Sequence, residues 1–139
     1  MNNKDWWLEE VKGISLIRFR HFEKQSGLKY FISTRHSGYS KGTSSSFNLG
    51  FQEHDTKDNV IGNRKLLADA LKIPLETFVF ANQTHNDNIK TVEKEDCGKG
   101  LFSKENAISD TDGFIVSIQD LCAVIMVADC VPVIIYPDF

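Results

Sequence analysis

The sequence has 139 residues, of which 41% are hydrophobic and 25% charged, and its formal net charge is -3. This length suits one ordinary domain with a buried core, and the composition is that of a globular protein, which excludes disordered and fibrous classes. The 16 basic and 19 acidic residues give no electrostatic footprint for nucleic acid or an anionic membrane, so we expect neither as a partner.

Apolar runs and cysteine usage predict a cytoplasmic protein. The longest apolar runs, 121–127 and 131–136, are far shorter than the ~20 residues that span a membrane, and the first ten residues lack the apolar centre of a signal peptide. Cys97, Cys122 and Cys130 cannot all pair, and none belongs to a C-x-x-C motif. This pattern favours reduced thiols.

The first half of the chain predicts a hairpin, a long loop and a helix. Residues 14–19 and 28–33 are rich in branched and aromatic side chains and read as two paired strands, whereas Trp6 and Trp7 read as a hydrophobic edge or contact. Residues 34–55 lack periodicity and form a long loop. Apolar residues recur at helical spacing over 56–72, with a cap at Asp55 or Thr56 and Pro74 as the stop.

The second half predicts mostly strands. Residues 78–80 and 89–92 read as strands around a polar turn, and a second long loop follows over 94–110. Strands are predicted again at 114–118, 121–127 and 131–135, the last two so continuously apolar that we expect both faces to be buried. Many strands around at least one helix indicate an α/β or α+β layered domain.

His85 and Cys130 are the first candidates for chemistry. Cys130 follows Asp129 at a predicted strand end, two residues before Pro132, so it is either a functional group or a small buried packing residue. His85 lies in the polar turn "NQTHND" and is either solvated or held as a base or metal ligand. Together they suit two chemistries: a thiol nucleophile activated by imidazole, or a zinc site.

The first long loop supplies Arg35, His36 and Asn48. A guanidinium suits a planar anion, and an asparagine amide suits a base edge or a hydroxyl. The alternative is a solvated loop in which Asn48 forms an Asx turn.

Six motifs, in order and spacing, resemble the laccase-domain family over residues 30–138. They are "STRHSGYS", "SSFNLGF", "DNVIGNRKLLADAL", "FANQTHNDNI", "DTDGFIVS" and "MVADCVPVIIYPD". The family was first described as multi-copper polyphenol oxidoreductases and is now understood as zinc-dependent purine nucleoside phosphorylases with adenosine deaminase activity. The resemblance implies a layered α-β-β-α sandwich with mixed sheets, of which residues 1–139 would be the amino-terminal part of a single domain.

The resemblance also implies site residues. Gln83-Thr84-His85 looks like the family's Q-x-H motif and Ala128-Asp129-Cys130 like its A-D-C motif, so His85 and Cys130 are expected as zinc ligands and catalytic residues. Arg35, Asn48 and Gln83 are expected to line the pocket for a purine nucleoside, such as adenosine, inosine or methylthioadenosine, and for phosphate. Copper belongs to the family's older description.

The sequence departs from the family pattern in two ways: three residues are substituted, and one motif has no counterpart. Ser37 and Tyr39 replace a glycine and a valine of the family's first motif, and Asn86 stands where glycine is common. The H-A-G-W-R-G motif that carries the family's third zinc ligand has no counterpart among these residues, so we expect weak zinc binding and little turnover from this chain. Uncovered strand edges would favour self-association.

Two other functions remain open at this stage. One is a non-catalytic remnant of the fold that binds a nucleoside or a protein partner. The other is a zinc-free cysteine hydrolase in which Cys130 is the nucleophile and His85 the base.

Overall fold

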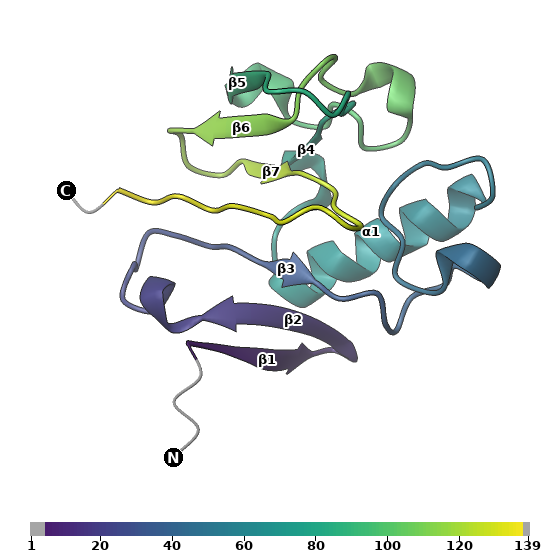
Figure 1. Cartoon of the computed structure of the whole chain (residues 1–139), viewed down its shortest axis with the longest axis horizontal. Helices are drawn as coiled ribbons and strands as arrows, with labels where there is room; N and C mark the ends of the chain where they lie inside the picture. The colour runs from purple at the N-terminus through teal and green to yellow at the C-terminus, as the bar shows by residue number, and fades with distance from the viewer. Residues whose placement is uncertain (1–4, 138–139) are drawn as a thin grey trace. The chain divides into compact units, whose positions relative to one another are not determined.

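A computed structural model describes residues 5–137, so Asp138 of the last motif lies outside the described residues. The chain divides into two compact units, Met1–Thr77 and Phe78–Phe139. Figure 1 shows an antiparallel sheet with one helix in the first unit and short parallel strand pairs in the second. The prediction of an α/β fold with mixed sheets is therefore confirmed. No described helix is long and apolar enough to cross a membrane.

The sheet of the first unit has the order β1-β2-β3, with β1 at Trp6–Val11, β2 at Ile14–Phe19 and β3 at Ile32–Ser33. Lys12 and Gly13 turn the chain from β1 to β2 with positive φ values of 48° and 85°, as a two-residue hairpin requires. The strand predicted at 14–19 is confirmed. The contribution of Trp6 and Trp7 as part of a strand was not predicted.

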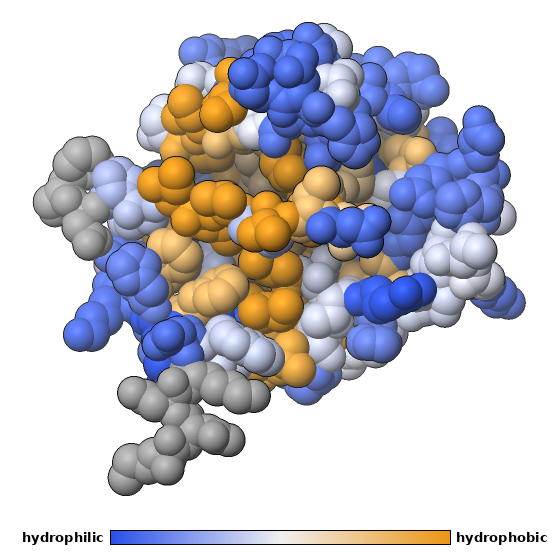
Figure 2. Space-filling model, viewed as in Figure 1, coloured by the Kyte–Doolittle hydropathy of each residue, from blue (hydrophilic) through white to orange (hydrophobic). Residues whose placement is uncertain are grey.

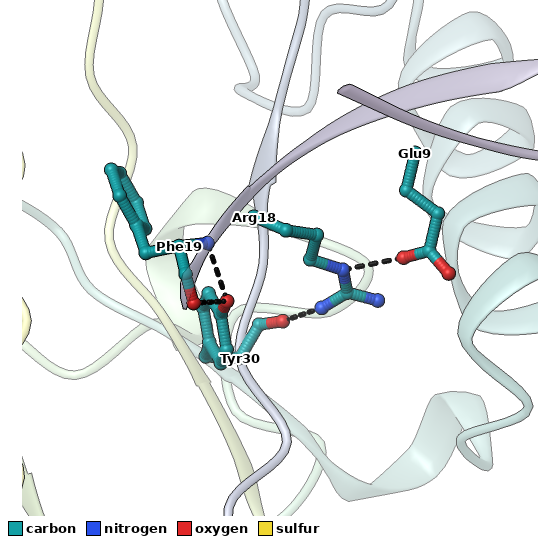
Figure 3. Close-up of polar contacts among 4 residues, drawn as sticks. All are labelled: Glu9, Arg18, Phe19 and Tyr30. Atoms are coloured by element: carbon teal, nitrogen blue, oxygen red, sulfur yellow. Dashed lines mark hydrogen bonds and ion pairs between the residues drawn. The ribbon is translucent and has the colours of Figure 1, made fainter. Parts of the chain in front are cut away.

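Only the last two residues of the strand predicted at 28–33 join the sheet, and Tyr30 explains why. Its hydroxyl accepts the backbone N–H of Phe19 at 2.6 Å and donates to the Phe19 carbonyl at 2.9 Å (Figure 3). Arg18 donates to the backbone carbonyl of Tyr30 and, at 2.5 Å, to the Glu9 carboxylate. The Tyr30 hydroxyl thus satisfies the N–H and the carbonyl of Phe19, the backbone groups with which a longer β3 would pair.

Helix α1 covers Lys57–Leu71, close to the predicted 56–72. Thr56 caps its start by accepting the N–H of Asn59 at 3.2 Å, and Lys72 ends it in the left-handed conformation, with φ 54°. The buried face is not purely apolar: it contains Asn63 and Arg64 together with Val60, Leu67, Ala68 and Ala70.

The second unit contains two parallel strand pairs. Strand β4 (Phe78–Phe80) pairs with β7 (Cys122–Val124), and β5 (Ile89–Val92) pairs with β6 (Gly113–Val116). All three residues of β4 are buried, as is typical of the continuous apolar run of a parallel strand that is covered on both faces. The loop predicted over 94–110 returns to β4, where Lys99 and Ile108 bond to the backbone of Phe80.

The predicted burial of 131–135 is wrong. This segment forms no strand, and Val131, Val133 and Ile135 are 84%, 76% and 85% exposed. Among residues 5–137 no backbone pairs with it in a ladder, and of its side chains only that of Ile134 is partly buried. The strand predicted at 121–127 also shortens to the three residues of β7, and Val127 is exposed.

Candidate functional site

His85 lies in the turn between β4 and β5, in the second unit (Figure 1). Its backbone is left-handed, with φ 59°, a conformation that histidine adopts more often than most residues with a Cβ atom. The side chain is exposed, and its ring makes no hydrogen bond to any described residue. An imidazole in this setting is free to bind a ligand from solvent.

The carboxylate of Asp112 binds the backbone of this turn. It accepts the N–H groups of Thr84, His85 and Asn86 at 3.1, 2.8 and 3.0 Å, and the Thr84 hydroxyl at 3.2 Å. Burial acts to raise the pKa of Asp112, but these hydrogen bonds outweigh it, so that the pKa lies below its usual value. The carboxylate is therefore ionised at neutral pH and holds the turn as an acceptor for successive N–H groups.

Gln83 bonds to the segment that leads to Cys130. Its side-chain amide donates to the Met126 carbonyl at 2.9 Å and accepts the Met126 N–H at 2.8 Å. Gln83 is two residues before His85, and Met126 is four residues before Cys130. A pair of hydrogen bonds therefore joins the first residue of the Q-x-H motif to the chain two residues before the A-D-C motif.

Cys130 is exposed, so its interpretation as a small buried packing residue is wrong. It lies at the end of a bend, over residues 128–130, instead of between two buried strands. Imidazole and thiolate are donors that zinc prefers, so His85 and Cys130 fit a zinc ion in their chemistry. Within residues 5–137 no three His, Cys, Asp or Glu side chains are grouped so that they could hold a metal.

Arg35 and Asn48 belong to the first unit, in the loop before α1. The Arg35 guanidinium donates through Nε and Nη2 to the Ser45 carbonyl at 2.9 and 2.7 Å, while its own carbonyl accepts the N–H groups of Ser46 and Phe47. The side chain is exposed. Within the described residues, Nη1 makes no hydrogen bond and can meet a ligand.

The side-chain amide of Asn48 is fully engaged. Its oxygen accepts the N–H of Gly50 at 3.0 Å, which is the Asx turn considered above, and its nitrogen donates to the Gly50 carbonyl and to Asp55. Burial acts to raise the pKa of Asp55, but hydrogen bonds from Ser40, Asn48, Asn59 and the Thr56 backbone lower it below the usual value. Asp55 thus links the loop to the start of α1.

Asn63 and Arg64, which sequence reasoning missed, hold this loop from the buried face of α1. The side chain of Asn63 is fully buried. Its oxygen accepts the N–H of Tyr39 at 2.8 Å. Its nitrogen donates at 2.8 to 3.2 Å to three loop groups: the Ser40 hydroxyl and the carbonyls of Ser46 and Asn48. Arg64 donates to the Leu49 carbonyl at 2.6 and 2.9 Å and lies 4.4 Å from the Phe51 ring centroid. Burial lowers the pKa of Arg64 to about 9, so it remains charged at neutral pH.

A signal for Asn63 was present in the sequence. It lies three residues after Val60 and four before Leu67, which places it on the apolar face at helical spacing. A buried amide needs partners for both its donor and acceptor groups, and the loop before α1 supplies them.

Residues 29–138 match the family model described as "Multi-copper polyphenol oxidoreductase laccase". The chain belongs to this family. Members of the laccase family that resemble it include the purine nucleoside phosphorylases YlmD of Bacillus subtilis, 34% identical over 105 residues, and of Geobacillus stearothermophilus, 35% identical over 102 residues. These matches cover 76% and 73% of this chain but 38% and 37% of the relatives, so the chain spans about two-fifths of their length.

Two solved structures that resemble this chain share its fold. The crystal structure of Bacillus licheniformis YfiH has a TM-score of 0.76 and 33% identity, and the match covers 88% of this chain and 43% of that one. YlmD from Geobacillus stearothermophilus has a TM-score of 0.70 and 27% identity, covering 94% and 44%.

Proposed function

We propose that this protein belongs to the purine nucleoside phosphorylases of the laccase family and that His85 and Cys130 are its zinc ligands. The observation that carries this proposal is the identity of 34% and 35% to relatives named purine nucleoside phosphorylase, over about three quarters of the chain. The exposure of both side chains is consistent with it, since a catalytic ligand must be reachable by substrate.

The proposed reaction exchanges one bond at the sugar for another. A phosphate oxygen forms a bond to C1′ of the nucleoside, and the bond from C1′ to N9 of the purine breaks with its electron pair going to N9. A proton from solvent then completes the free purine, and the second product is the sugar 1-phosphate. Zinc, when bound, would supply Lewis acidity, and we propose that the same site deaminates adenosine.

The residues of this chain would bind and orient the substrates. The free Nη1 of Arg35 suits a phosphate oxygen, because a guanidinium remains charged at all physiological pH values. The side-chain amides of Asn48, in the first unit, and Gln83, in the second, each hold the neighbouring backbone, and we propose that each contributes to substrate binding through the backbone that it fixes.

A phosphorolysis assay tests this function. Purified chain is incubated with inosine, inorganic phosphate and zinc, and hypoxanthine and ribose 1-phosphate are measured, with adenosine and methylthioadenosine as further substrates. We expect slow, phosphate-dependent release of the base, since residues 1–139 supply two of the three ligands that the resemblance implies. Loss of product in His85→Ala and Cys130→Ala, but not in the exposed control His54→Ala, would support the assignment.

The same assay separates this function from cysteine hydrolysis. A zinc-dependent phosphorylase loses activity with a chelator and regains it with zinc, whereas a thiol nucleophile loses activity on alkylation and ignores the chelator. The absence of any base release above the blank, with zinc and phosphate present, would contradict the proposal.

A second candidate, protein binding or self-association, is favoured by one observation. In Figure 2 hydrophobic residues, in orange, gather on the second unit over β6 and the extended segment that follows β7. The exposed members there include Ile115, Val116, Val131, Val133 and Ile135. An extended apolar segment without a ladder partner is a template for pairing with another strand.

Sedimentation velocity over a hundredfold range of chain concentration tests this candidate. We expect concentration-dependent dimers or larger species, which Val133→Lys should reduce and the control Thr91→Lys, at an exposed polar position, should not. A monomer throughout the range would contradict self-association.

A further inference from the structure

The backbone conformation of His85 is unfavourable in itself. A φ of 59° brings the Cβ atom of a residue other than glycine close to the following carbonyl, at a cost in free energy that contacts around the residue can offset. Residues in sparsely populated backbone regions persist where their surroundings determine them, and they cluster at functional sites. The compensating contacts of His85 are therefore informative about its role.

Those contacts come from one side chain, that of Asp112. Its Oδ1 accepts the N–H groups of Thr84 and His85, at 3.1 and 2.8 Å, and its Oδ2 accepts that of Asn86 at 3.0 Å. Three successive backbone donors on both sides of His85 thus converge on one carboxylate. No other described acceptor bonds these three N–H groups.

Asp112 is itself fixed from the other side. Its backbone N–H donates to the Asn88 carbonyl at 2.8 Å, and the next residue, Gly113, begins β6 and donates to the same carbonyl at 3.2 Å. The preceding residue, Thr111, is fully buried, and its hydroxyl donates to the Ser109 carbonyl at 2.8 Å. The carboxylate is therefore presented to the His85 turn from a rigid point on the sheet.

The orientation of the His85 ring depends on the backbone conformation that Asp112 stabilises. Ligand histidines ordinarily donate their second ring nitrogen to a carboxylate or carbonyl that orients the ring. The His85 ring has no such partner within residues 5–137, so the backbone conformation, which fixes the direction of the Cα–Cβ bond, is what determines the region that the ring can reach.

We propose that Asp112 is the positioning residue for His85: by binding the N–H groups of residues 84–86 it fixes the left-handed backbone that aims the imidazole at its ligand. The inference rests on the proposed role of His85 as a metal ligand. An aspartate suits the position because both of its oxygens accept, whereas an asparagine would turn an N–H₂ group toward one of the backbone donors.

The test compares Asp112→Asn with Asp110→Asn in the 139-residue chain. Asp110 is a matched control, since among the described residues its side chain accepts only the Thr84 hydroxyl, at 2.6 Å, and no N–H of the turn. Two quantities are measured: amide hydrogen exchange of residues 84–86 by NMR, and the dissociation constant for Co²⁺ as a spectroscopic substitute for zinc. Amide protection in β4 and β5 shows that each variant remains folded.

We expect Asp112→Asn to lose protection at residues 84–86 and to raise the Co²⁺ dissociation constant about tenfold, the size of effect typical for a partner that orients a ligand. Asp110→Asn should stay within about twofold of the wild type in both measurements. Unchanged protection and unchanged affinity in Asp112→Asn would overturn the proposal, as would a loss of affinity of the same size in Asp110→Asn.

Failure of the metal role is distinguishable from failure of the positioning role. If the wild type binds no Co²⁺, the ligand assignment of His85 fails, and amide exchange alone then decides whether Asp112 holds the turn. If Asp112→Asn does not fold, the double variant His85→Gly/Asp112→Asn decides, because glycine adopts positive φ without strain. Recovered folding supports the proposal, and continued failure to fold overturns it.

Discussion

Gln83 and Met126 are joined by a reciprocal pair of hydrogen bonds, Nε2 to the carbonyl at 2.9 Å and Oε1 from the N–H at 2.8 Å. The side-chain amide acts here as a strand partner would, because it satisfies both backbone groups of one residue. The pair connects the turn that contains His85 with the segment that leads to Cys130.

Replacing Gln83 by glutamate tests this connection. The substitution keeps the size but removes the donor and brings a carboxylate toward the Met126 carbonyl, so we expect a loss of about 1–3 kcal/mol in unfolding free energy. Urea unfolding measures this loss, and amide exchange at residues 126–130 should rise. The exposed control Gln119→Glu should change neither quantity, and equal behaviour of the two variants would contradict the role of Gln83.

Asn63→Ala should release the loop that contains Arg35 and Asn48. The variant removes four hydrogen bonds from a fully buried amide and leaves loop carbonyls without their donor, which costs about 2–4 kcal/mol in all. Limited trypsin digestion at the exposed Lys41 reports loop opening directly, and we expect faster cleavage. Lys65→Ala, on the exposed face of α1, is the control; a cleavage rate in Asn63→Ala equal to that of the control would refute the prediction.

Substituting alanine at Gly38 and, as the control, at Gly27 tests how closely the backbone around Gly38 is packed. A Cβ atom at Gly38 would overlap the Ser46 carbonyl and lie 2.5 Å from Phe47 Cα, whereas one at Gly27 would meet nothing within 4 Å. Gly38→Ala should therefore lower the melting temperature, because the clash is with backbone that cannot rotate away. Gly27→Ala should leave it unchanged or raise it, since alanine restricts the unfolded chain. Similar melting temperatures for the two variants would argue against this packing.

Cysteine alkylation should be selective. Burial raises the pKa of the Cys122 thiol to about 12, so at pH 8 only about one molecule in ten thousand has the reactive thiolate there. Cys130 is exposed. Iodoacetamide followed by peptide mass mapping should label Cys130 in the folded chain and Cys122 only after denaturation; labelling of Cys122 as fast as Cys130 before denaturation would be the contrary result.

The stability of the first unit should fall in acid partly through Asp55. The pKa of Asp55 in the folded chain lies below its usual value. The ionised carboxylate therefore adds to the free energy of unfolding above the unfolded-state pKa, and this stabilisation is lost below about pH 4, as the pH falls through the folded-state pKa. Asp55→Asn should be less stable than the wild type at pH 6, and the difference should shrink toward pH 3. In the control Asp69→Asn, on the exposed side of α1, the difference should stay small throughout; a gap for Asp55→Asn that does not depend on pH would contradict the assignment.

The sequence predicted correctly those elements whose capping residues and apolar spacing lie close together in the chain. Helix α1 was predicted to within two residues because Thr56, the apolar spacing and Pro74 are all local. The strand at 131–135 was predicted wrongly because hydrophobicity indicates that a segment prefers burial, not that a partner is present to bury it.

In the candidate site, too, the sequence predicted the residues with local signals and missed the contacts between distant segments. Residue types and the family motifs singled out His85 and Cys130, whereas Asp112, although it lies in the motif "DTDGFIVS", was given no role. Asp112 contacts His85 across 27 residues of sequence, and Gln83 contacts Met126 across 43. Neither contact has a local pattern, so the fold had to be known before either could be identified.

Co²⁺ binding monitored by the thiolate-to-cobalt charge-transfer band tests the assignment of His85 and Cys130 most directly. We expect the wild-type chain to give the band, Cys130→Ser to abolish it, His85→Ala to weaken binding, and the control Cys97→Ser to keep both band and affinity. A band that survives in Cys130→Ser, or that disappears in Cys97→Ser, would contradict the assignment of these ligands.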